Sequence, residues 1–261
     1  MCSSDLIAFA VPRTEFSPAA RADSAAVPAL LGRSLADGGL RRLYVGVFSL
    51  HFVLMASFLS LPAVFETHLG VPRESHATLY LPTLLLSLAI MVPMMIVAER
   101  TRRVRLMFLL GILLLAAAQF SLAIMPWTLH LVVAALVIFF GGFNYLEATL
   151  PSVVSKTVYA GGRGTALGVY STAQFLGAFC GGAAGGWVLQ SHGHSTVFMF
   201  SALVALAWWL LALGMSEPRN LDNIVYQFDS GCDDMPARTE RLRALAGVEE
   251  VLVVEIGRAH V

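Results

Sequence analysis

A single carboxylate, Glu147, lies inside an otherwise apolar stretch, FFGGFNYLEATLPSVVSK, that runs from Phe139 to Lys156. Asn144 precedes it by three residues, so the two side chains share one face of a helix, and Pro151 follows one turn later. An ionisable group in hydrocarbon costs several kcal/mol unless it faces a partner or a water-filled path. Glu147 is therefore predicted to be either a functional residue or one member of a buried ion pair.

The partners that the sequence suggests for Glu147 are the arginines of the loop Glu99–Arg103, ERTRR. If the stretch enters the bilayer at Leu129, Glu147 lies about 27 Å deep, close to the opposite boundary. This depth favours a gate or structural ion pair with Arg100 or Arg103 over a direct role in proton coupling. Both readings stay open, as does the reading that Glu147 does neither.

Other polar side chains in apolar stretches are candidates for lining a cavity or relaying protons. His51 lies about 12 Å into the first apolar stretch, and an intramembrane histidine is able to change charge near neutral pH. The alternative is a neutral ring bonded to a neighbouring helix, and the sequence favours this alternative. Asn144, Gln174 and Tyr170 are further cavity candidates, although interhelical hydrogen bonds would explain them equally well.

Glycines are concentrated in the stretch from Thr165 to Leu189 and just before it. Small residues four positions apart form a flat stripe that lets another helix approach closely. The sequence therefore predicts helix packing here, with a glycine hinge as the less favoured alternative. The glycines concerned are Gly164, Gly168, Gly177, Gly181, Gly182, Gly185 and Gly186.

Composition indicates a membrane protein, because 57% of the residues are hydrophobic and only 13% are charged, against about 25% charged in soluble domains. The net charge of zero argues against a nucleic-acid partner. The three cysteines have no spacing typical of a metal site, and no serine has a histidine and an acid placed to activate it. The sequence thus predicts no cofactor, no metal site and no enzymatic activity.

Six apolar stretches of roughly the 20 residues that a membrane-spanning helix needs follow one another. They predict an all-α polytopic bundle over residues 43–215. Basic residues fall almost entirely on one set of connections, with Arg73 on the other set, which places both ends of the chain in the cytoplasm. The stretches are Leu43–Phe65, Leu79–Val97, Leu106–Met125, Leu129–Val154, Thr165–Leu189 and Val197–Met215.

The flanking segments are predicted to be cytoplasmic. Residues 1–42 form a linker with a short surface helix near Ala29–Leu35. Residues 216–254 predict a strand, a helix near Pro236–Ala246 and a second strand at Val248–Val254, which is the beginning of a small α+β domain. The first six residues and residues 255–261 resemble translated sequencing-adapter sequence, so we expect both to be artefactual.

These features together resemble the C-terminal half of a major facilitator superfamily transporter. The loop Glu99–Arg103 resembles the family's signature G-x-x-x-D-R/K-x-G-R-R, with Glu99 in place of the aspartate and Arg102 in place of the second glycine. FNYLEA at Phe143–Ala148 and GTALGVYS at Gly164–Ser171 resemble the proton-coupled drug-efflux branch. Members of that branch carry a ferredoxin-like cytoplasmic domain after the last helix, which fits residues 216–254.

The resemblance implies proton-coupled efflux of small amphipathic compounds by alternating access, in the bacterial inner membrane. The implied partners are a small-molecule substrate, protons, the lipid bilayer and an N-terminal six-helix half. Glu147 with Arg100 or Arg103 would then hold the cytoplasmic side shut. The alternative is a non-transporting membrane scaffold or sensor that acts through its cytoplasmic tail.

Overall fold

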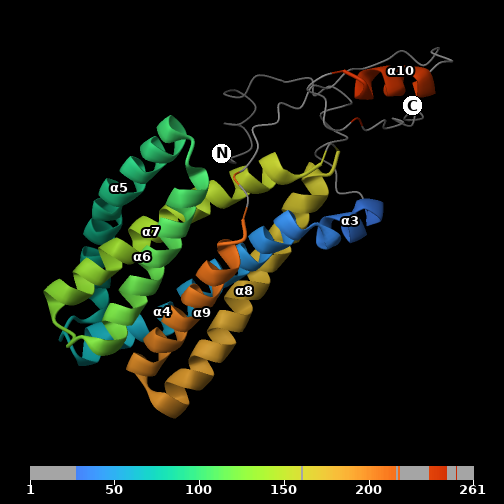
Figure 1. Ribbon diagram of the computed structural model, residues 1–261. Coiled ribbons are helices and arrows are strands. Elements are labelled where there is room, and N and C mark those ends of the chain that lie inside the picture. Colours follow the sequence, from blue (N-terminus) through green and yellow to red (C-terminus); the bar gives the residue numbers. More distant parts are fainter. Residues whose placement is uncertain (1–27, 160, 216, 218–234, 246–250, 252–261) are drawn as a thin grey trace, which may run out of the picture.

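Six long helices form a bundle in the structure of the chain, a computed structural model that describes residues 28–159, 161–215, 217, 235–245 and 251 (Figure 1). A 3-10 turn, Pro28–Leu30, and the short helix α3, Leu31–Ala36, precede the bundle, and Arg73–Ser75 forms a second 3-10 turn. Helix α10, Met235–Arg243, follows the bundle. The six long helices are α4 (Gly38–Thr67), α5 (His76–Thr101), α6 (Val104–Ile124), α7 (Leu129–Thr157), α8 (Arg163–His192) and α9 (His194–Ala212).

Each of the six predicted apolar stretches corresponds to one of these helices, and most of the helices extend a few residues further than predicted. Five of them, among the residues that the structure describes, are long and apolar enough to cross a membrane: α4, α5 with the turn before it, α6, α7 and α9. Helix α8 has 30 residues but falls short in hydropathy, because glycine is far less apolar than leucine or valine. The prediction of six membrane spans is therefore supported for five helices and stays a prediction for α8.

The soluble segments are only partly described. The predicted surface helix near Ala29–Leu35 corresponds to α3, and the helix predicted at Pro236–Ala246 corresponds to α10. The two predicted strands, with the exception of Val251, lie outside the described residues, so the ferredoxin-like domain stays a prediction.

Short-range signals set the ends of the helices. The side chain of Asp37 accepts a hydrogen bond from the backbone N–H of Leu40 at 2.8 Å, which caps the first turn of α4. Helix α5 ends at Thr101 and is followed by its C-cap residue Arg102, whose φ of 53° and ψ of 27° lie in the left-handed region. This is the position at which the signature carries its second glycine, and a left-handed C-terminal residue explains that glycine.

The six helices divide into two three-helix units that pack in the same way, one formed by α4, α8 and α9 and the other by α7, α5 and α6. Helix α4 packs along α8 as α7 packs along α5, and α6 lies against α9. The contact of α4 with α9 corresponds to that of α7 with α6. Exchanging α4 with α7, α5 with α8 and α6 with α9 therefore maps the contacts within one unit onto those within the other. The two units meet where α6 packs on α9 and where α4 packs on α7.

The closest helix contact runs along the glycine stripe of α8. A Cβ atom at Gly177 or Gly181 would collide with the backbone carbonyl of Phe48 or Phe52 on α4, and one at Gly185 would lie 2.8 Å from the Cα atom of Ala56. The two backbones are therefore in van der Waals contact, as small-residue stripes permit.

The other predicted packing glycines of α8 behave differently from this stripe. Gly168 and Gly182 have no atom within 4 Å of an added Cβ, and Gly186 has only a side-chain atom of Leu59 at 3.9 Å. Gly168, Gly182 and Gly186 therefore lie on other faces of the same helix, away from its backbone contact with α4, and their role in helix packing stays a prediction. Gly164 lies in the first turn of α8, half buried.

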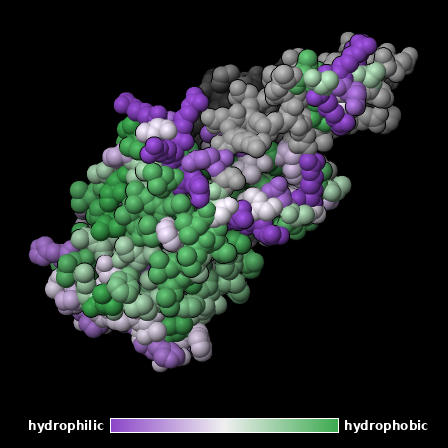
Figure 2. Space-filling view, viewed as in Figure 1, coloured by the Kyte–Doolittle hydropathy of each residue, from purple (hydrophilic) through white to green (hydrophobic). Residues whose placement is uncertain are grey.

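The surface of the bundle is broadly apolar. A wide hydrophobic region covers the helices, and hydrophilic residues gather at the ends of the bundle (Figure 2). Leu81 and Leu85 on α5 and Phe175 and Phe179 on α8 are 62–73% exposed. Exposed apolar side chains on this scale are expected where lipid or another set of helices covers the surface.

We predict that Gly181→Ala destabilises the protein whereas Gly182→Ala does not. The methyl group at position 181 would force α4 and α8 apart, at a cost of about 1–3 kcal/mol. At position 182 the methyl group meets open space, and alanine stabilises a helix by roughly 0.5–1 kcal/mol relative to glycine. Thermal unfolding of the purified protein in detergent measures both effects, and equal melting temperatures for the two variants would contradict the packing.

We also predict that Arg102→Gly stabilises the protein by about 0.5–1 kcal/mol, because it removes the left-handed strain of a residue with a side chain. Arg103→Gly removes the same charge one residue later, where φ is −103°, so it should not stabilise. Chemical or thermal unfolding of the two variants, measured side by side, separates backbone strain from charge.

Candidate functional site

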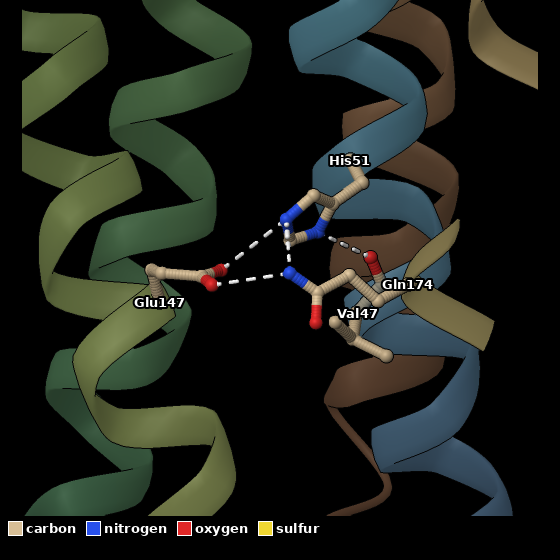
Figure 3. Close-up of polar contacts among 4 residues, drawn as sticks. All are labelled: Val47, His51, Glu147 and Gln174. Carbon is tan, nitrogen blue, oxygen red and sulfur yellow. Dashed lines mark hydrogen bonds and ion pairs between the residues drawn. The ribbon is translucent and has the colours of Figure 1, made fainter. Parts of the chain in front are cut away.

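Glu147, His51 and Gln174 meet between α7, α4 and α8 (Figure 3). The Nε2 atom of Gln174 lies 2.9 Å from Nε2 of His51 and 3.4 Å from Oε1 of Glu147. The other carboxylate oxygen, Oε2, lies 3.6 Å from Nε2 of His51. One amide nitrogen thus bridges the two groups that are able to carry charge.

The hydrogen bonds define the tautomer of His51. A glutamine amide nitrogen only donates, so Nε2 of His51 must accept and carries no proton. The proton of the neutral ring therefore lies on Nδ1, which donates to the carbonyl oxygen of Val47 at 3.1 Å. The reverse orientation of the amide would direct the Gln174 oxygen at the Glu147 carboxylate, which is repulsive.

The site is enclosed on the His51 side and more open on the Glu147 side. The His51 side chain is 11% exposed and that of Glu147 is 36% exposed. The Oε2 atom of Glu147 is nevertheless shielded from solvent and accepts no hydrogen bond from the described residues. The Phe143 ring packs edge-on against His51, with ring centroids 6.0 Å apart. An acceptor that is shielded and unbonded is available to a proton or to a donor group of a ligand.

Tyr170 and Asn144 lie close to this site. Tyr170, on α8 one turn before Gln174, is 5% exposed, and its hydroxyl has no hydrogen-bond partner among the described residues. Asn144, on α7 one turn before Glu147, donates from Nδ2 to Oγ of Ser87 on α5 at 3.1 Å. Asn144 is thus bonded to a neighbouring helix here, whereas Tyr170 has an unused polar group.

The expected pairing of Glu147 with Arg100 or Arg103 does not occur. The carboxylate faces His51 instead, and no ion pair joins it to an arginine in the part of the chain that the structure describes. The reason is the length of α7, which continues past Glu147 from Ala148 to Thr157, about 15 Å. Glu99, Arg100 and Arg103 lie at the end of α5 and in the following loop, beyond the level of the site.

Sequence reasoning missed two connections. It named His51, Gln174 and Glu147 separately without joining them, and it did not identify Ser87 as the partner of Asn144. A further polar contact of this kind joins α6 to α4, where Nε2 of Gln119 donates to Oγ of Ser57 at 2.7 Å. The signal available was the presence of one polar residue in each of several apolar stretches, because such residues tend to bond to one another.

We predict that Tyr170→Phe raises the stability of the ligand-free protein by about 1 kcal/mol, because it removes a buried hydroxyl that has no partner. Tyr44→Phe is the matched control. Tyr44 is equally buried, but its hydroxyl lies 2.7 Å from Oγ of Ser34, so this change should lower stability. Thermal unfolding in detergent compares the two variants, and a destabilised Tyr170→Phe protein would show that the hydroxyl has a partner.

Comparison with known proteins identifies the family. The model of the Major Facilitator Superfamily matches residues 6–181 and, in an overlapping second match, residues 43–229. The inner membrane transport protein YajR of Escherichia coli (strain K12) is 34% identical over 233 residues, which cover 89% of this chain and 51% of YajR.

Two further relatives are uncharacterized transporters of Buchnera aphidicola. The one from subspecies Acyrthosiphon pisum (strain APS) is 33% identical over 140 residues, 54% of this chain and 36% of its own length. The one from subspecies Schizaphis graminum (strain Sg) is 30% identical over 172 residues, 66% of this chain and 44% of its own length. The chain spans about half the length of the relatives that it matches, or less. It belongs to the major facilitator superfamily.

Proposed function

We propose that the chain is the C-terminal half of a proton-coupled secondary transporter that exports small amphipathic compounds across the bacterial inner membrane by alternating access. The observation that carries the proposal is the cluster of Glu147, His51 and Gln174 within otherwise apolar helices. Ionisable residues inside membrane helices are rare and mark ion or substrate paths. The name of YajR, an inner membrane transport protein, supports the location.

In this proposal the partner of the chain is a second six-helix half that covers the exposed apolar faces of α5 and α8. The match to about half of YajR supports such a partner. With the arginine-rich connections on the cytoplasmic side, residues 1–42 link the two halves, and residues 216–254 form part of a ferredoxin-like cytoplasmic domain. Both ends of the chain then lie in the cytoplasm, and α8 is the remaining membrane span.

The residues of the site have distinct roles in this mechanism. Glu147 and His51 exchange the coupling proton, since one is an acid and the other a base at 3.6 Å. The unbonded hydroxyl of Tyr170 binds the ligand. Asn144 also binds the ligand once its hydrogen bond to Ser87 has broken. The proximity of an acid and aromatic rings suits an amphipathic compound that carries a donor or a positive charge.

Two further sets of residues would act when the transporter changes between its inward- and outward-facing states. Glu99, Arg100 and Arg103 act as a gate on the cytoplasmic side. The glycine stripe Gly177, Gly181 and Gly185 lets α8 rock against α4 while the two backbones stay in contact.

The proposal predicts that Glu147→Gln in the full-length transporter lowers proton-driven efflux by on the order of tenfold or more, because an amide cannot carry the proton. The measurement is accumulation of a panel of fluorescent amphipathic dyes in cells that express the transporter, compared with cells that lack it. Inverted membrane vesicles then show whether dye movement consumes the proton gradient.

Glu74→Gln is the matched control for this experiment. Glu74 is exposed in the 3-10 turn Arg73–Ser75 before α5 and has no role in the proposed mechanism, so its loss should leave efflux and proton coupling intact. Efflux and coupling that are unchanged in Glu147→Gln would refute the role of Glu147. If expression changes the accumulation of no dye in the panel, the proposed substrate class is wrong.

A further inference from the structure

The side-chain amide of Gln174 donates a hydrogen bond to Nε2 of His51, which is the ring nitrogen that would accept a second proton. Both hydrogens of this amide nitrogen are in use, one toward Nε2 of His51 at 2.9 Å and one toward Oε1 of Glu147 at 3.4 Å. His51 and Glu147 are not directly hydrogen-bonded, because 3.6 Å between Nε2 and Oε2 is too long for a hydrogen bond.

We propose that Gln174 is a positioning residue that keeps the proton of His51 on Nδ1 and holds the ring apart from Glu147 until a second proton displaces the amide. This inference rests on the proposed function, because it concerns the pair through which the coupling proton would pass.

The displacement follows from the chemistry of the ring. A hydronium ion transfers a proton to Nε2 and leaves as water, so that a new N–H bond forms and the ring has two N–H groups and a charge of +1. Because a protonated nitrogen no longer accepts, the hydrogen bond from Gln174 breaks. The new N–H group turns to Oε2 of Glu147, which has no other donor among the described residues. Release of the proton to water restores the bond from Gln174.

The position of Gln174 is fixed by the backbone contact beside it. Gly177 lies one turn after Gln174, and its Cα faces the carbonyl of Phe48, which lies one turn before His51. The helices cannot separate to release the amide without breaking this contact. The Gln174 side chain must therefore rotate, or α8 must slide along α4, when the proton binds.

The other groups that face His51 do not provide a competing donor. Helix α7 presents the carboxylate of Glu147, which only accepts, and the hydroxyl of Tyr170 on α8 makes no hydrogen bond to His51 or to any other described residue. Helix α9, which also packs on α4, has no titratable residue between Ser195 and Ala212. The Gln174 amide and an incoming proton therefore compete for Nε2 of His51.

The test is the tautomer of His51 in the full-length protein in liposomes, read from nitrogen-15 NMR of histidine-labelled samples at about pH 9, where an ordinary histidine is neutral. The signal is assigned by its loss in His51→Gln. We expect the proton on Nδ1 in the unsubstituted protein. In Gln174→Met, which keeps the length of the side chain without a donor, the ratio of tautomers should shift toward Nε2–H by about fivefold to tenfold.

Gln190→Met is the matched control, because Gln190 is exposed near the other end of α8 and its loss should leave the tautomer unchanged. A proton on Nε2 in the unsubstituted protein would overturn the proposal, even if Gln174→Met does not fold. An unchanged tautomer in a folded Gln174→Met protein would also overturn it. Neither result depends on transport, so a failure here is distinct from a failure of Glu147→Gln to impair coupling.

Discussion

The backbone contact between α4 and α8 is the constraint on which the rest of the structure depends. Gly177, Gly181 and Gly185 bring α8 against the main chain of α4 at Phe48, Phe52 and Ala56. In a bilayer, where lipid is as apolar as the side chains, such close packing is a main source of helix association. The same contact fixes the level of Gln174 relative to His51, so the geometry of the polar site follows from the glycines.

The polar site formed by Glu147, His51 and Gln174 is less completely satisfied than the helix packing around it. Three polar side chains from three helices meet where apolar residues would have packed more simply. At and beside this site, Oε2 of Glu147 and the hydroxyl of Tyr170 have no hydrogen-bond partner among the described residues. Buried polar groups that are only partly satisfied lower stability. They lie between α4 and α7, which belong to different three-helix units, so a change in charge here would act on both units.

The sequence predicts the helices well because a run of about 20 apolar residues is a strong, local signal. It also identifies Glu147, His51 and Gln174, since a polar residue in such a run is conspicuous. It does not predict that they meet, because the meeting depends on the level and rotation of three helices, and one helix turn moves a side chain by about 5 Å. The expected arginine partner of Glu147 was wrong for this reason. Arg102 shows the opposite case, because the family signature anticipates a glycine where the structure has a left-handed residue.

The low hydropathy of α8 has a consequence for how the protein is made. Apolar helices enter the membrane one by one and associate afterwards, and α4, α5, α6, α7 and α9 are suited to this route. Helix α8 gains less from lipid, because glycines occupy the positions at which its neighbours carry leucine or valine. The glycines of α8 pack on the backbone of α4, and α4 precedes α8 in the chain, so it is synthesised first. In the proposed six-span transporter, insertion of α8 and its assembly with α4 are therefore expected to occur as one event during translation.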